Sequence, residues 1–220
     1  TNEGQKISKS LGNTIDAQKL VSEYGQEQTR YFLMREVPFG QDGNFSHQNM
    51  ISRINSELAN KLGNLAQRTL SMVHKNLGGE VPTIKYHSGD LMKHIEALPA
   101  RVHTAMNEPD FSQALEEIMA CVDIANAYID HQAPWALRKT DMAKMASVLY
   151  HLLEALRYIG VLLSPFTPKA MESLLDQLQI PQELRTLASL TPEHRLVGGV
   201  KLPPPHALFP RYNTMPDGVA

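Results

Sequence analysis

Residues 47–79, HQNMISRINSELANKLGNLAQRTLSMVHKNLGG, decide the fold class of this 220-residue chain. Apolar side chains recur in this stretch every three or four positions, at Met50, Ile51, Ile54, Leu58, Leu62, Leu65, Ala66 and Val73. Such spacing places them on one face of an α-helix. The pattern ends at Gly78-Gly79, which is typical of a helix C-terminus. The stretch therefore predicts one long amphipathic helix.

Similar patterns on both sides predict further helices. Downstream, apolar stripes cover residues 91–102 (interrupted by Pro99), 111–129, 142–163 and 169–178. Asp110 is the expected N-cap of the second of these, and Ser164-Pro165 closes the third. Upstream, Asp16 is an expected N-cap for residues 17–24, and residues 26–37 form a second short helix that stops at Pro38. We therefore predict a mainly α fold, an up-and-down helical bundle with a short N-terminal loop and helix segment.

Composition divides the chain into three parts. Residues 1–46 combine a polar loop with two short helices, residues 47–180 carry the long stripes, and residues 181–220 are predicted to hold a C-terminal helix and an extended strap around Pro203-Pro204-Pro205. The chain starts at Thr1 with a loop motif already present. We expect it to be the C-terminal part of a longer protein.

Charge and cysteine content limit the function classes. The 21 Lys and Arg against 23 Asp and Glu give a net charge of −2, so any RNA must bind a local patch, and we expect no DNA partner. Cys121 is the only cysteine, which excludes an internal disulfide and indicates a reducing compartment, the cytoplasm or alternatively an organelle matrix. The longest apolar run, residues 159–163, is too short to span a bilayer. No histidine spacing supports a metal site.

A lysine-rich loop lies near the N-terminus. Lys6-Ile7-Ser8-Lys9-Ser10 is followed by Leu11-Gly12-Asn13. Two ammonium groups and two hydroxyls so close together can converge on a phosphate. The alternative is an exposed loop with solvated lysines.

A second group of candidates lies on the long helix and beyond it. Asn64 and Arg68 are one turn apart on the face opposite the apolar stripe, where an amide and a guanidinium can together contact the edge of a base. Trp135, the only tryptophan, follows Pro134 just past a helix and precedes Arg138 and Lys139. A tryptophan held in this way can stack on an unpaired base. The alternatives are a solvated helix face and a core anchor.

The loop resembles the Lys-Met-Ser-Lys-Ser signature of class I aminoacyl-tRNA synthetases, with Ile7 in place of Met. The resemblance implies that Lys9 stabilises ATP phosphates during adenylate formation. It also implies that Lys6, Ile7, Ser8 and Ser10 shape a mobile ATP-binding loop, with Lys6 and Lys9 as the catalytic candidates.

Four further segments resemble methionyl-tRNA synthetases: residues 64–68, 133–135, 38–46 and 208–211. The resemblance implies that Asn64, Arg68 and Trp135 contact the first anticodon base of tRNA(Met), a cytosine. It implies a complete methionine–tRNA ligase that uses ATP and Mg²⁺, with methionine and ATP held by a nucleotide-binding catalytic domain outside this chain. We expect this part alone to bind no cofactor and to be catalytically inactive.

Two rival interpretations stay open from the sequence. One is a class I synthetase for leucine, isoleucine, valine or cysteine. The other is a non-enzymatic helical module whose Met-rich stripes, including Met142 and Met145, bind partner helices. His131, near Trp135, has two interpretations, a contribution to the shape of the anticodon site and a satisfied structural histidine, and we favour the second.

Overall fold

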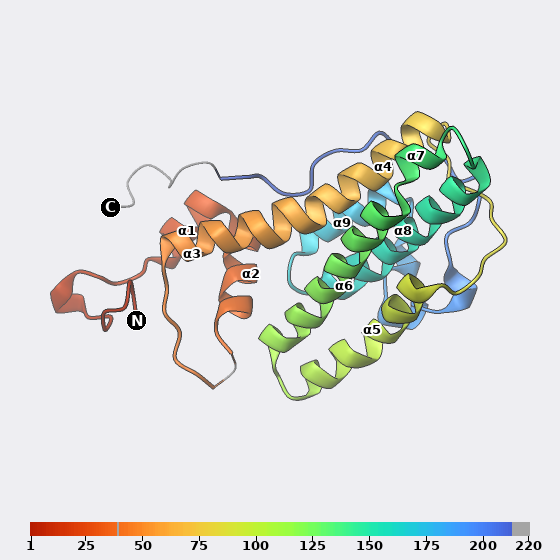
Figure 1. Cartoon of the computed structure of the whole chain (residues 1–220). Coiled ribbons are helices and arrows are strands. Elements are labelled where there is room, and N and C mark those ends of the chain that lie inside the picture. Colours follow the sequence, from red (N-terminus) through yellow and green to blue (C-terminus); the bar gives the residue numbers. More distant parts are fainter. Residues whose placement is uncertain (39, 213–220) are drawn as a thin grey trace.

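The computed structural model describes residues 1–38 and 40–212, and this part of the chain is mainly α-helical, as predicted. Phe39 of the predicted connecting segment and residues 213–220 of the predicted tail lie outside the described residues. The helices are α1 (Ala17–Tyr24), α2 (Gln26–Glu36), α3 (His47–Arg53), α4 (Asn64–Asn76), α5 (Asp90–Asn107), α6 (Phe111–Gln132), α7 (Pro134–Leu137), α8 (Met142–Leu163) and α9 (Pro168–Gln177). Figure 1 shows α4, α5, α6, α8 and α9 packed together as a bundle, with α1–α3 at one end.

The first two helices begin and end as the local chemistry predicts. The Asp16 carboxylate accepts a hydrogen bond from the Gln18 N–H at 2.8 Å, which caps α1. Gly25 adopts a φ of 85° between α1 and α2, a conformation that is unfavourable for residues with a side chain. The second helix ends at Glu36, one residue before the predicted end.

The predicted long helix forms, but its middle is wider than an α-helix. Residues Ile54–Gly63 join α3 to α4 with π-helical hydrogen bonds, and the Asn64 N–H bonds to the carbonyl of Ala59. The Asn126 side chain donates to the carbonyl of Lys61 at 3.3 Å, so α6 supplies a partner for the altered backbone. The expected apolar face is buried nonetheless: Leu58, Leu62 and Leu65 are fully inaccessible.

Pro99 does not interrupt its helix, contrary to the sequence interpretation. Helix α5 continues through it from Asp90 to Asn107. A proline removes one backbone hydrogen bond and crowds the preceding turn. The nearby carbonyl of His94 accepts hydrogen bonds from the Arg101 guanidinium at 3.4 Å and the Cys121 thiol at 3.8 Å. Helix α5 therefore accommodates the proline while it is packed against α6.

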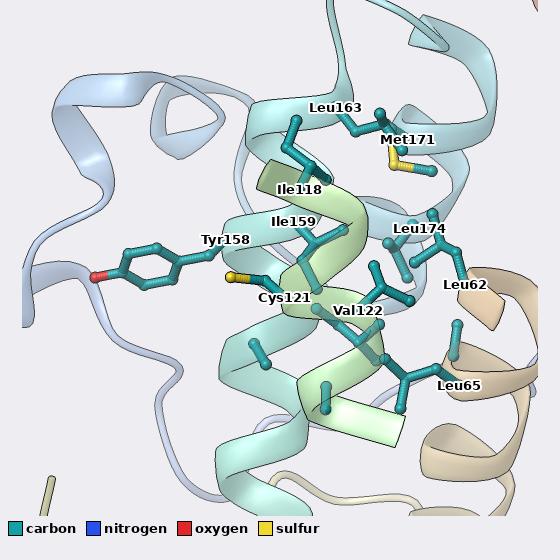
Figure 2. Packing of buried hydrophobic residues seen from close by; sticks show 14 of the residues in the cluster. Leu62, Leu65, Ile118, Cys121, Val122, Tyr158, Ile159, Leu163, Met171 and Leu174 are labelled. Carbon is teal, nitrogen blue, oxygen red and sulfur yellow. The ribbon is translucent and has the colours of Figure 1, made fainter. Parts of the chain in front are cut away.

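Helix α8 forms the centre of the bundle and packs against α4, α5, α6, α7 and α9. Every residue from Val148 to Leu163 is buried. By length and a mean hydropathy of 1.4 the helix could cross a membrane, but 89% of its apolar window lies inside the protein. Figure 2 shows Ile159 and Leu163 of α8 meeting Ile118 and Val122 of α6, with Met171 and Leu174 of α9 beside them. A core location thus accounts for its composition.

The methionines support core packing over the helical-module alternative. Met50, Met92, Met119, Met145 and Met171 are all buried. Of the pair singled out in the sequence, only Met142 is exposed.

The tail is a strap, but its described part, residues 181–212, holds three short 3-10 turns in place of the expected helix. The turns are Gln182–Leu184, Leu187–Ser189 and Pro192–His194. The strap then pairs with the segment after α4, where the Val81 N–H bonds to the Val200 carbonyl at 2.9 Å. It runs back along the bundle to the N-terminal helices (Figure 1), where the Tyr212 hydroxyl donates to the Tyr24 carbonyl at 2.6 Å.

Candidate nucleic-acid interface

Trp135 is the second residue of α7 and follows a sharp turn at the end of α6. Ala133 ends α6 with a left-handed φ of 43°, a conformation that costs a residue other than glycine about 1–3 kcal/mol. Pro134 is buried and begins α7. At the first position of a helix the backbone N–H has no partner within the helix, so a proline there costs no hydrogen bond. The turn leaves the Trp135 side chain 50% exposed. The indole is therefore not a core anchor, and it is free to stack on a ligand.

Arg68 lies beside the indole. Its guanidinium carbon is 5.5 Å from the centroid of the Trp135 ring, within the range of a cation–π contact. The same guanidinium donates to the Asp130 carboxylate at 2.6 Å. Asp130 of α6 thus holds the guanidinium of Arg68, a residue of α4, next to the indole. The tertiary structure brings together two of the predicted anticodon residues that are far apart in sequence.

Asn64 is exposed one turn before Arg68, at the first residue of α4. Among the described residues, nothing hydrogen-bonds its side-chain amide, which leaves both its donors and its acceptor available. One turn further towards the N-terminus, Lys61 pairs with Asp123 of α6 at 2.7 Å. Two cation–carboxylate pairs therefore cross from the long helix to α6 along this surface.

Asp123 and Asp130 are the residues that sequence reasoning missed. They lie two turns apart on α6, as Lys61 and Arg68 do on the long helix. That matching separation was a signal available in the sequence. Nothing in the sequence, however, showed that these two faces are adjacent.

The lysine-rich loop is held by the asparagine that follows it. The Asn13 side chain accepts from the Ser8 N–H at 2.8 Å and donates to the Lys6 carbonyl at 3.0 Å. Ser8 and Ser10 share a hydroxyl hydrogen bond of 2.7 Å, and Lys9 opens a 3-10 turn, Lys9–Leu11. The serine hydroxyls thus shape the loop as it stands.

The two lysines and the apolar side chain of the loop face outwards. Lys6 and Lys9 are exposed, and no described acidic residue pairs with either side chain. Ile7 is 42% exposed and lines a small apolar hollow with Phe32 and Leu33. The loop can present two charges to an anion. It lies at the opposite end of the molecule from α7 (Figure 1), so the two candidate sites are distinct.

No group of three or more His, Cys, Asp or Glu side chains within residues 1–38 and 40–212 is arranged to hold a metal ion.

Two family descriptions match consecutive parts of the chain. Residues 1–70 match the class I tRNA synthetases (M), and residues 81–214 match the anticodon-binding domain of methionyl tRNA ligase. The second match alone covers more than half of the 220 residues.

Curated relatives agree with these matches. The chain is 47% identical over 218 residues to a methionine–tRNA ligase of Rickettsia felis, covering 96% of this chain and 43% of that protein. It is 48% identical over 214 residues to a methionine–tRNA ligase of Brucella suis, covering 96% of this chain and 41% of the relative. The chain therefore spans less than half the length of these relatives.

Solved structures show the same relationship. The fold superimposes on methionyl-tRNA synthetase of Mycobacterium tuberculosis in complex with methionyl-adenylate with a TM-score of 0.90 and 41% identity, covering 96% of this chain and 42% of that one. The ligand-free form of that enzyme gives a TM-score of 0.88 and 38% identity, covering 97% of this chain and 42% of that one.

Proposed function

Because the chain belongs to the methionyl-tRNA synthetase family, we propose that the surface formed by Asn64, Arg68 and Trp135 reads the first base of the methionine anticodon. The contact between the Arg68 guanidinium and the exposed indole supports this proposal most directly. In this proposal, a base stacked on the indole brings its edge to the Arg68 guanidinium and the Asn64 amide. These groups offer N–H donors to the acceptors of cytosine and one carbonyl acceptor to its amino group.

The charge on this surface favours selectivity over general RNA attraction. Asp123 and Asp130 neutralise Lys61 and Arg68 locally, and the whole chain has a net charge of −2. Nonspecific RNA affinity depends mainly on cations that contact phosphates. We infer that stacking and contacts with the base edge contribute most of the binding energy here.

The test replaces Trp135 in the complete enzyme. Stacking on an aromatic side chain contributes about 1–3 kcal/mol per base. Trp135→Ala should therefore raise the Kd for a labelled anticodon stem-loop with cytosine first by about 5- to 150-fold. Trp135→Phe should retain most of the affinity. The matched control is Leu33→Ala, which removes an exposed apolar side chain from α2. An unchanged Kd for Trp135→Ala, or an equal loss with a stem-loop whose first base is uracil, would contradict the proposal.

We further propose that the loop of residues 6–10 contacts ATP phosphates during methionine activation, with Mg²⁺ accompanying the nucleotide. The support is two exposed ammonium groups on a loop that Asn13 holds in shape. In the complete enzyme, Lys9→Ala should slow methionyl-adenylate formation in single-turnover kinetics without changing tRNA affinity. Lys93→Ala, an exposed lysine on α5, is the control. A normal adenylation rate for Lys9→Ala would count against this role.

We also propose that these 220 residues by themselves bind tRNA without aminoacylating it. The chain spans 43% of the length of the Rickettsia felis relative, and we infer that methionine activation needs the remaining part as well. Methionine-dependent ATP–pyrophosphate exchange above background by the isolated chain would disprove this.

A further inference from the structure

A second hollow lies at the end of α6. The same end of α6 contributes Asp130 to the surface formed by Asn64, Arg68 and Trp135, which we call the indole surface. The hollow has a volume of about 580 Å³ and lies between α6, the start of α8 and the segment that leads into α5. Its lining includes Tyr128, His131, Lys144, Ser147 and His87. The volume is within the range of about 300–1,000 Å³ that is typical of small-ligand sites. The His131 side chain is exposed here.

Three polar groups in this hollow lack partners within the described part of the chain. The Lys144 ammonium, the Tyr128 hydroxyl and the Ser147 hydroxyl make no ion pair or hydrogen bond there. Asp90 at the rim pairs with Lys93 at 3.1 Å, and its side chain is 94% exposed. Burial raises the pKa of Tyr128, so its phenol stays protonated and can donate. The hollow thus offers one cation and two hydroxyls to an anionic or polar ligand.

Aromatic side chains behind the hollow support His87, which is one of its lining residues. The His151 ring lies 5.2 Å from the ring of His87 and hydrogen-bonds to the His87 carbonyl at 3.1 Å. Burial lowers the pKa of His151, which keeps this ring neutral. Behind it, Arg195 of the strap lies 3.5 Å from the ring centroid of Tyr86. Flat rings next to a cation suit a nucleotide, which has a planar base and a charged phosphate.

The hollow adjoins the indole surface through α6 itself. Asp130, which holds Arg68 next to Trp135, is the immediate neighbour of His131, which lines the hollow. Adjacent helix positions differ by about 100° around the axis. The two surfaces therefore meet at the end of α6, where consecutive residues contribute to each of them.

We propose that this hollow receives the nucleotide next to the first anticodon base, with its phosphate at Lys144 and its base among Tyr128, His87 and His131. This proposal rests on the anticodon-reading role of the indole surface.

The test combines a protein variant that fills the hollow with two RNAs that differ at one anticodon position. Ser147→Trp places an indole in the cavity, and its effect is measured by anisotropy with two labelled anticodon stem-loops. One stem-loop is intact, and the other is abasic at the neighbouring anticodon position. Ser147→Trp should raise the Kd of the intact RNA by about tenfold, as expected for the loss of one stacked base. It should change the Kd of the abasic RNA by less than about twofold.

A charge variant gives a second readout. Lys144→Met should reduce the slope of log Kd against log salt by about one phosphate contact. The matched control, Lys169→Met on α9, should leave the slope unchanged. A free nucleoside monophosphate should not compete at concentrations that leave the stem-loop bound. Strong competition by it would point to a free nucleotide as the ligand and overturn the assignment.

Other outcomes separate this proposal from the one on which it rests. Equal weakening of both RNAs by Ser147→Trp, or no weakening, would overturn the assignment of the hollow. If Trp135→Ala still weakens binding in that case, the indole surface stands and only the hollow is misassigned. If Trp135→Ala also has no effect, the anticodon surface itself is wrong.

Discussion

The ion pair inside α8 allows the sharpest prediction about stability. Glu154 and Arg157 are 0% and 1% exposed, and the guanidinium donates to the carboxylate at 2.9 Å. The carboxylate also accepts from the Leu196 N–H at 2.5 Å, and the guanidinium donates to the Ser189 carbonyl at 2.9 Å. The pair therefore anchors the strap at two points on the central helix.

Arg157→Met leaves the buried carboxylate with the Leu196 N–H as its remaining described partner. Breaking a buried pair by removing one member costs about 3–5 kcal/mol. For a protein of this size each kcal/mol corresponds to about 2–4 °C, so Tm should fall by about 6–20 °C. Glu154→Leu combined with Arg157→Met removes both charges but still leaves one backbone donor and one acceptor unpaired, at about 1–3 kcal/mol for each buried group. The double variant should thus lose less than the sum of the two single variants.

The assay is urea and thermal unfolding followed by circular dichroism, with limited proteolysis of the strap as a local readout. A loss below about 1 kcal/mol for Arg157→Met would refute the reasoning that burial makes this pair costly to break. So would a double variant that loses the full sum. Because Arg195 of the strap lies on Tyr86 next to the hollow, a loosened strap should also weaken binding of the intact stem-loop.

Three further predictions follow from single contacts. Arg68→Lys keeps the charge but loses the planar group that we propose contacts the base edge. Binding of the cytosine-first stem-loop should therefore weaken by about two- to fivefold, the equivalent of about 0.5–1 kcal/mol for one hydrogen bond. Equal affinity in titration would argue against a contact between Arg68 and the base. Asn13→Ala should slow adenylate formation in the complete enzyme, because it removes both hydrogen bonds that hold the loop. Asn13→Asp should recover part of the rate, because the aspartate keeps the acceptor for the Ser8 N–H. Equal rates for both variants would disprove the role of Asn13 in holding the loop. Burial lowers the pKa of His151 below its ordinary value of 6.5, so at that pH the unfolded chain binds a proton that the folded chain does not. The free energy of unfolding should therefore fall as the pH drops through 6.5. His151→Phe should flatten this pH dependence in urea unfolding, and an unchanged slope would exclude His151 as its source.

Local sequence patterns were enough to predict most of the helices and to identify the family. Stripes such as Leu58, Leu62 and Leu65 specify a buried face, because only one side of a helix can meet the core. Asp16 and Asp110 specify helix starts through hydrogen bonds to nearby N–H groups. These signals are local, and each acts within a few residues. The combination of the loop at residues 6–10 with Asn64, Arg68 and Trp135 was also sufficient to indicate methionyl-tRNA synthetases, and the comparisons confirm it.

Features that involve contacts between two elements could be seen only in the folded chain. The π-helical stretch Ile54–Gly63 receives a hydrogen bond from Asn126 of α6, a partner that spacing alone could not identify. The pairing of Arg68 with Asp130, and the exposure of Trp135 beside them, required two distant segments to meet. Side-chain periodicity records which face of a helix is buried. It does not record which helix covers that face, because any apolar stripe of the same width can bury it, and the binding surface exists only once that choice is made.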